Sequence, residues 1–273
     1  MPVVVSGPDG LERHPGIAVT PILLERGPGV FSVVGTGFYV TRYGLFLTAK
    51  HVVEALVAGD GRTLRKAYAW QLSDEPAMCL RQIRTVTFEP RSPCDYPDIA
   101  VCQADNFLEK VPDRPIMNER IALDLAVPAS GAPIATYAFP ENPELDFNDR
   151  ATPPLLRARF FEGVMEEEVG DHPHLRYPHF RSTMSVLSGA SGGPTFAASG
   201  NAFAVNCLGM ELLDGDHLSS LVPVAGFLAL PVPMTFLPPQ SWEYSAIPEH
   251  RRGKPLTGQE LVEYGHVTLA HDS

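Results

Sequence analysis

The sequence predicts an all-β protein of the barrel or sandwich kind. Many short runs of β-branched and aromatic residues follow one another along the 273 residues, and few stretches show a helical period. The 27 prolines and 23 glycines are numerous for a helical protein and suit tight turns between strands. A hydrophobic content of 44% and a charged content of 19% are typical of an ordered globular chain.

The strand-like runs fall into two sets without a usable internal repeat. A polar connection near residues 104–118 separates the sets. The glycines at 35 and 37 predict a bend or bulge inside the second run of the first set. The runs of the first set are 17–24, 30–40, 45–48, 67–72, 82–88 and 98–102, and those of the second are 133–139, 156–161, 176–181, 202–206 and 219–224.

Charge and hydropathy exclude some classes of partner. The formal charge of −11 argues against nucleic acid, whose phosphates need clustered Lys and Arg, and the best basic cluster is only 250–254. No run approaches the roughly 20 apolar residues of a membrane span, so no membrane partner is expected. The first residues do not resemble a secretion signal. We therefore expect a cytoplasmic protein whose four cysteines, which form no CxxC pair, are reduced.

The stretch 185–196, SVLSGASGGPTF, surrounds Ser191 with glycines. By itself it is more typical of a polar turn than of a catalytic loop. Two further patterns add to it: His51 follows a strand within 47–53, and Asp98 heads the apolar run 98–101. A serine hydroxyl needs a histidine to take its proton and a carboxylate to orient that imidazole. The three patterns together predict nucleophilic hydrolysis.

These motifs resemble those of trypsin-like serine peptidases of the chymotrypsin fold, and most closely the bacterial HtrA-type branch. The matching segments are 35–38 (GTGF), 48–53 (TAKHVV), 98–101 (DIAV) and 189–194 (GASGGP), and the resemblance covers roughly residues 15–226. The order His, Asp, Ser and the separations of 47 and 93 residues also suit the family.

The resemblance implies two six-stranded antiparallel β-barrels with the active site in the cleft between them. The expected divisions are an N-terminal barrel over 15–105, a linker over 106–125, a C-terminal barrel over 126–226 and a tail over 227–273. His51 and Asp98 would belong to the first barrel and Ser191 to the second. The tail is expected to be packed or partly mobile.

The resemblance also implies a role for each site residue. Ser191 would be the nucleophile, His51 the base and Asp98 its orienting carboxylate, with Asp95 as a weaker rival for the third role. The N–H groups of Gly189 and Ser191 would form the oxyanion hole. The specificity pocket would be lined by Ser185, Val186, Cys207, Leu208, Gly209 and Met210. None of these is charged, which predicts a small or apolar residue on the acyl side of the cut.

Two departures from the family pattern bear on how the activity could be regulated. Ala190 stands where secreted zymogens carry the aspartate that binds a newly cut N-terminus, so that form of activation is unavailable. The segment 227–273 is too short for the PDZ domain that HtrA-type proteins usually append.

Other polar and aromatic residues have simpler interpretations. His172, His174 and His179 match no zinc spacing and are expected in exposed loops, and neither metal nor cofactor is expected. The acidic run 166–168 is interpreted as a solvated loop, with substrate steering as the alternative. Cys94 is expected to be a plain thiol rather than a redox group. Trp70 and Trp242 are expected to be packing residues.

The function predicted from the sequence is serine endopeptidase activity with limited cleavage of a specific intracellular protein. Bacterial proteases of this stand-alone kind are often paired with a dedicated protein substrate, so a protein encoded nearby is a candidate partner. A catalytically silent scaffold with the protease fold is the alternative from another class. An esterase using the same residues is a third possibility. The sequence does not predict the oligomeric state.

Overall fold

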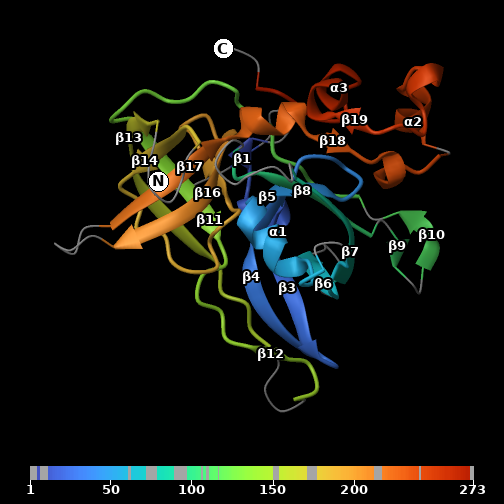
Figure 1. The fold of residues 1–273 in the computed structure, drawn as a ribbon, viewed down its shortest axis with the longest axis horizontal. Helices are drawn as coiled ribbons and strands as arrows, with labels where there is room; N and C mark the ends of the chain where they lie inside the picture. Colours follow the sequence, from blue (N-terminus) through green and yellow to red (C-terminus); the bar gives the residue numbers. More distant parts are fainter. Residues whose placement is uncertain are drawn as a thin grey trace.

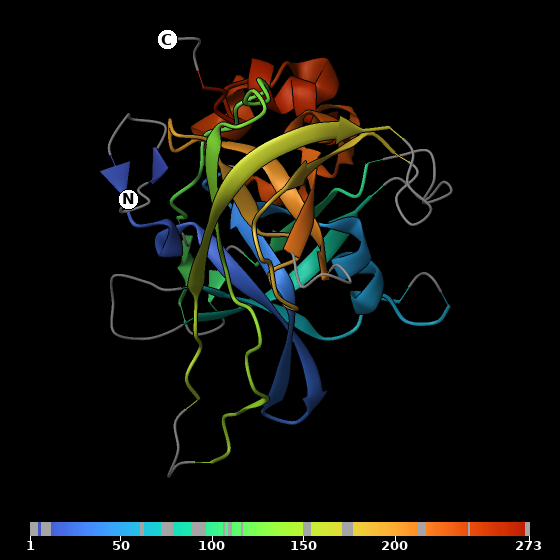
Figure 2. The same cartoon turned by 90° about the vertical axis from the view of Figure 1, so that its left-hand side faces the viewer.

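The structure, a computed structural model, consists of two β-barrels side by side and a C-terminal segment across one end (Figures 1 and 2). It describes residues 5–6, 12–60, 63–71, 79–88, 97–105, 107–108, 111–115, 117–149, 154–170, 177–211, 217–239 and 241–270.

Six antiparallel strands form the first barrel, in the order β4-β3-β6-β7-β8-β5. Pairing of β4 with β5 closes it, and the short β12 (Leu145–Asp146) adds to β4. The strands are β3 (Val19–Gly27), β4 (Val30–Tyr39), β5 (Leu45–Thr48), β6 (Ala67–Gln71), β7 (Cys79–Thr87) and β8 (Ala100–Ala104).

The second barrel is closed by six antiparallel strands in the order β11-β13-β14-β17-β16-β15. Its strands are β11 (Pro133–Ala138), β13 (Arg159–Val169), β14 (His179–Ser182), β15 (Pro194–Phe196), β16 (Ala202–Glu211) and β17 (His217–Pro223). The predicted fold of two six-stranded antiparallel barrels is therefore confirmed. The exact divisions at 15–105, 106–125, 126–226 and 227–273 stay predictions.

Short elements connect and flank the barrels. The only α-helix within the described part of the barrels is α1, which follows β5. These elements are β1 (Val5–Ser6), β2 (Glu12–Arg13), η1 (Pro15–Ile17), α1 (Lys50–Leu56), β9 (Phe107–Leu108) and β10 (Val111–Pro115).

The bulge expected at the glycines of β4 is present. The β3–β4 register passes from Ile22 opposite Gly35 to Leu23 opposite Val33, which leaves Val34 as the extra residue. Gly37 lies beneath the Phe46 ring, where an added Cβ would come within 2.6 Å of a ring carbon. The bulge and the missing side chains let this strand pass close to its neighbours at the site described below.

The acidic run 166–168 lies in a strand and not in the predicted loop. β13 extends to Val169, well beyond the predicted end at 161. Glu167 and Glu168 are exposed on it, while Met165 is buried, and Glu167 Oε1 lies 3.9 Å from Arg181 Nη1 of the neighbouring β14. A strand with one solvated face accommodates glutamates, which is why their presence was a poor indicator of a loop.

A single apolar core joins the barrels to the C-terminal segment. Leu47 and Ile99 of the first barrel belong to the same cluster of buried residues as Val205 and Val222 of the second. Such a shared core holds the facing edges of the two barrels in a defined arrangement, on which any site built between them depends.

The described residues of the C-terminal segment pack onto this core. Phe227, Leu256 and Leu261 have no exposed surface, and Thr257 and Glu260 form a capping box at α3. Its elements are η2 (Val224–Ala229), β18 (Pro231–Val232), η3 (Met234–Phe236), α2 (Trp242–Ala246), η4 (Glu249–Arg251), β19 (Leu256–Thr257) and α3 (Gly258–Glu263).

Two further expectations need correction. Trp70 is a packing residue, but Trp242 is 70% exposed. His179 is buried in β14, where its Nδ1 lies 3.0 Å from the Tyr177 carbonyl oxygen, rather than in an exposed loop.

Cys102 and Cys207 are free and buried, as expected of reduced thiols. None of the helices that the structure describes has the length and apolarity to cross a membrane.

Because Leu261 anchors α3 in the shared core, we expect Leu261→Ala to lower the free energy of unfolding by about 2–5 kcal/mol. Glu263→Ala on the exposed face of the same helix serves as the control, with an expected change within about 0.5 kcal/mol. Urea unfolding measures both. Equal stabilities of the two variants would show that the segment does not contribute to the core.

Candidate active site

His51 and Asp98 are brought together by two neighbouring strands of the first barrel. β5 and β8 pair with Thr48 opposite Ala100, so the residues just beyond β5 lie beside those just before β8. Asp98 accepts two hydrogen bonds from His51. Its Oδ1 accepts from the backbone N–H at 2.9 Å, and its Oδ2 lies 2.6 Å from the ring Nδ1. Two contacts to one carboxylate fix both the position and the tilt of the imidazole.

His51 and Asp98 differ in the exposed fraction of their side chains and in the direction of their pKa shifts. The side chain of Asp98 is 10% exposed and that of His51 is 43% exposed. Burial lowers the pKa of His51, but the hydrogen bond and the negative charge of Asp98 outweigh it and raise the pKa above the usual value. Burial raises the pKa of Asp98, and the contacts with His51 outweigh that effect and lower it. A proton on Nδ1 is therefore held by Asp98, which leaves Nε2 as the proton acceptor.

Cys207 and Tyr177 cover the buried side of Asp98. The Cys207 thiol donates to the Asp98 carbonyl oxygen at 3.4 Å, and burial together with the charge of Asp98 raises its pKa. Burial raises the pKa of Tyr177, with Cys207 and Asp98 acting in the same direction, and its buried hydroxyl has no hydrogen bond of normal geometry. Both side chains are therefore neutral. The motifs pointed to neither contact, because these residues are distant from Asp98 in the chain.

The loop that carries Ser191 fits against the first barrel only because it contains glycine. Gly192 has a φ of +88°, and a Cβ there would overlap the hydroxyl of Thr48 and the carbonyl oxygen of Thr36. On the other side, a Cβ at Gly35 would come within 3.0 Å of the Ser191 carbonyl oxygen. The backbones of the two barrels thus touch at the serine.

Thr36 of β4 is the main polar link across this contact. Its N–H donates to the Ser191 carbonyl oxygen at 2.8 Å, and its hydroxyl donates to the Gly189 carbonyl oxygen at 2.9 Å. The same hydroxyl accepts the N–H of Phe139 at 3.1 Å, and the Thr36 carbonyl oxygen accepts the Thr48 hydroxyl at 2.7 Å. The sequence contained this residue in the GTGF motif without indicating a role for its side chain.

The backbone before Ser191 leaves two N–H groups open. The Ser188 carbonyl oxygen accepts the N–H of Glu141 at 2.9 Å, and in a trans peptide the N–H of Gly189 must point the opposite way. Within the described residues no hydrogen bond uses the N–H of Gly189 or of Ser191. Two nearby donors are therefore free to bind one anionic oxygen.

The Ser191 hydroxyl forms no hydrogen bond with His51 among the described contacts. Its Oγ donates to the Cys207 carbonyl oxygen at 3.1 Å, and no hydrogen bond joins these two described residues, Ser191 and His51. A rotation about the serine Cα–Cβ bond would redirect the hydroxyl. Catalytic hydrogen bonds are often poorly formed without substrate, so this geometry is compatible with Ser191 as a nucleophile.

The two segments expected to line the specificity pocket, 185–186 before the nucleophile and 207–210 on β16, lie against each other. A Cβ at Gly209 would overlap the Val186 carbonyl oxygen, so no space for a side chain separates the two backbones. Leu208 is 36% exposed, Ser185 is half-buried, and the Cys207 side chain faces Asp98. Met210 belongs to β16, and its side chain lies outside the described residues. Substrate contacts by these six residues stay a prediction.

Several other candidates lie outside the described residues, namely Cys94, Asp95, His172 and His174. Among the residues that the structure does describe, no group of His, Cys, Asp and Glu has the arrangement of a metal site.

Comparison with known proteins identifies the fold. No family model matches the chain, and no curated protein matches it. Among solved structures, Deg5 is similar with a TM-score of 0.53 and 17% identity over 77% of this chain and 85% of that one. A serine endoprotease from Yersinia pestis is similar with a TM-score of 0.50 and 16% identity over 77% and 60%. An inactive mutant of Rv3671c from M. tuberculosis H37Rv reaches a TM-score of 0.47 at 15% identity over 78% and 83%.

At such identities the first two similarities establish the fold alone. The chain has the chymotrypsin-like two-barrel fold of trypsin-like serine peptidases. The resemblance to the HtrA-type branch is thus confirmed at the level of the fold.

We expect Thr36→Val to lower the free energy of unfolding by about 1–3 kcal/mol, since it leaves the Gly189 carbonyl and the Phe139 N–H without their side-chain partner. Thr36→Ser keeps the hydroxyl and serves as the control, with a smaller loss of about 0.8 kcal/mol for the methyl group. Equal urea midpoints for the two variants would contradict the role of the hydroxyl.

Proposed function

We propose that the protein is a serine endopeptidase that uses Ser191, His51 and Asp98. The observation that carries the proposal is the hydrogen-bonded His51–Asp98 pair, which Cys207 connects to Ser191 through hydrogen bonds with Asp98 and with Ser191. The pair lies within a fold used by serine peptidases. The open N–H groups of Gly189 and Ser191 add a place for the developing oxyanion.

The reaction would begin when substrate displaces the Ser191 hydroxyl from the Cys207 carbonyl oxygen. His51 Nε2 then takes the hydroxyl proton while Oγ attacks the peptide carbonyl, and Asp98 stabilises the imidazolium. The N–H groups of Gly189 and Ser191 bind the oxyanion. His51 next protonates the leaving amine, and a water deprotonated by His51 hydrolyses the acyl-enzyme.

The substrate is proposed to be a protein or peptide with a small or apolar residue on the acyl side of the cut. The uncharged lining and the contact between Val186 and Gly209 both favour a small side chain there. Limited cleavage of one specific intracellular protein follows as the narrower form of the proposal, because only substrates that separate these backbones would enter.

A catalytically silent scaffold is the second candidate. The absent hydrogen bond between Ser191 and His51 and the contact of Val186 with Gly209 are the observations that favour it. Reaction of Ser191 with an electrophile separates the two candidates, because a silent scaffold does not activate its serine.

We expect an alkyl fluorophosphonate to label Ser191, with Oγ bonded to phosphorus and fluoride released. Peptide mass spectrometry locates the adduct. Ser191→Ala should abolish labelling and His51→Ala should slow it about 10²–10⁴-fold. Ser188→Ala changes an exposed serine on the same loop and should leave the rate unchanged. An unlabelled Ser191 in the folded wild type would contradict the enzyme and leave the scaffold.

The pH dependence tests the His51–Asp98 pair. Protonated His51 cannot act as a base, so the labelling rate should fall as the pH drops through the His51 pKa, which lies above the usual 6.5. Asp98→Asn removes the charge that raises this pKa and should move the midpoint to lower pH, besides slowing the reaction. Asp105→Asn, which breaks an ion pair with Arg84 elsewhere, should leave the midpoint unchanged. An unshifted midpoint in Asp98→Asn would contradict the assignment.

A further inference from the structure

Glu141 is the one non-glycine residue with a positive φ in the described part of the chain. Its φ of +45° lies in the left-handed region, which residues with a side chain rarely occupy. The side chain is exposed, and its Oε2 lies 3.8 Å from Arg159 Nη1. An ion pair between two side chains that are each about half exposed contributes little free energy. The reason for the conformation therefore lies in the backbone of Glu141.

The backbone of Glu141 runs between two anchored points of the chain. On one side, the Glu141 N–H donates to the Ser188 carbonyl oxygen at 2.9 Å. On the other side, Asn142 is fixed to the segment that leads into β13. Its Nδ2 donates to the Arg157 carbonyl oxygen at 3.0 Å, and its Oδ1 accepts the Arg157 N–H at 2.7 Å. The positive φ of Glu141 turns the chain so that both contacts form.

The contact with Glu141 favours one orientation of the peptide between Ser188 and Gly189. Gly189 has a φ of +91°, and glycine adopts positive and negative φ about equally readily. This peptide could therefore turn over, which would point the Ser188 carbonyl oxygen into the oxyanion hole and the Gly189 N–H away from it. Within the described residues, the hydrogen bond from Glu141 is the only one that this peptide group makes. It favours the orientation with the open Gly189 N–H.

The turn that contains Glu141 also packs against Gly189. A Cβ at Gly189 would lie 2.9 Å from the Phe139 carbonyl oxygen and 3.5 Å from the Glu141 nitrogen. The next peptide along the chain is held from the first barrel, because the Thr36 hydroxyl donates to the Gly189 carbonyl oxygen at 2.9 Å. Glu141 and Thr36 thus hold the peptide groups on the two sides of Gly189.

We propose that Glu141 is a positioning residue of the candidate active site. Its left-handed backbone holds the 188–189 peptide so that the Gly189 N–H points at the developing oxyanion. This inference rests on the proposed function, because an oxyanion forms only if Ser191 attacks its substrate. The side chain of Glu141 has no part in this role. The backbone preference of the residue at position 141 should therefore set the reaction rate.

The plateau rate of fluorophosphonate labelling, measured above the pH midpoint, tests this role, because the phosphoryl oxygen of the probe occupies the oxyanion hole. Glu141→Pro removes the N–H and fixes φ near about −65°, so the rate should fall about 10²–10³-fold, as for the loss of one oxyanion donor. Glu141→Gly keeps the N–H and adopts a positive φ without strain, so it should restore the rate to at least that of the wild type. Glu141→Val has a β-branched side chain that disfavours this backbone, and its rate should lie between those of the wild type and Glu141→Pro. The exposed valine keeps the test valid if the proline variant does not fold.

Arg159→Gln serves as the matched control, because it removes the ion pair of Glu141 and leaves the backbone intact. Its labelling rate should equal that of the wild type. The pH midpoint should stay unchanged in every Glu141 variant, since that midpoint depends on the His51–Asp98 pair. Equal plateau rates in the folded wild type and the folded Gly and Val variants would overturn the proposal, and so would a midpoint that moves with them.

Amide hydrogen exchange tests the contact without any reaction at Ser191. After correction for intrinsic rates, the Glu141 N–H should exchange about tenfold or more slowly than the open Gly189 N–H in NMR spectra of the native protein. An unprotected Glu141 N–H would overturn the inference. An unlabelled wild-type Ser191 beside a protected Glu141 N–H would contradict the proposed function, and with it any role of Glu141 in a reaction. A labelled wild type with unaffected Glu141 variants would contradict this inference alone.

Discussion

The hydrogen bonds of Thr36 are the interaction on which the candidate site depends. One residue of the first barrel holds the carbonyl groups of Gly189 and Ser191, and through them the loop of the second barrel. These bonds exist only because Gly35 and Gly192 let the two backbones approach. A side chain at either glycine would clash with atoms of this contact and force the loop of Ser191 away from the first barrel.

The two halves of the candidate site differ in how many of their expected hydrogen bonds are formed. His51 and Asp98 come from adjacent strands of one barrel, and their contact is complete without substrate. Ser191 belongs to the other barrel, and its hydroxyl is held by the Cys207 carbonyl, beside the contact between Val186 and Gly209. In the proposed reaction, substrate would reorient this hydroxyl and separate the two backbones. That requirement would restrain the candidate site until a suitable chain is bound.

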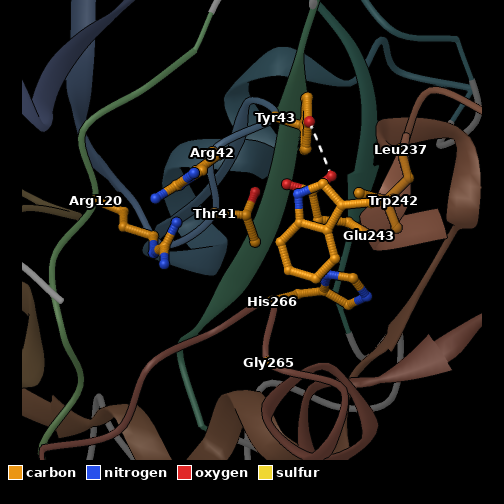
Figure 3. A pocket seen from close by; sticks show the side chains of 9 residues that line it. All are labelled: Thr41, Arg42, Tyr43, Arg120, Leu237, Trp242, Glu243, Gly265 and His266. Carbon is orange, nitrogen blue, oxygen red and sulfur yellow. Dashed lines mark hydrogen bonds between the residues drawn. The ribbon is translucent and has the colours of Figure 1, made fainter. Parts of the chain in front are cut away.

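The hairpin of β4 and β5 lies at both the candidate active site and a pocket that Arg42 and Trp242 help to line (Figure 3). Thr36 lies within it and His51 lies in α1 just after it, while its turn forms one wall of the pocket of Arg42 and Trp242. The C-terminal segment forms the other wall and is anchored in the same core as both barrels. The hairpin thus has one end at the candidate active site and its turn at the pocket.

The sequence by itself determined the all-β class, most strand positions and the residues of the candidate triad. Those features follow from alternation and from short motifs, which are local properties of the chain; β5, for example, spans the predicted 45–48. Only the tertiary structure decided the roles of Thr36 and Tyr177, the direction of the Cys207 thiol, the burial of His179 and the exposure of Trp242. Each of these depends on residues that are distant in sequence and come into contact only after the barrels close. A local sequence pattern contains no information about such contacts.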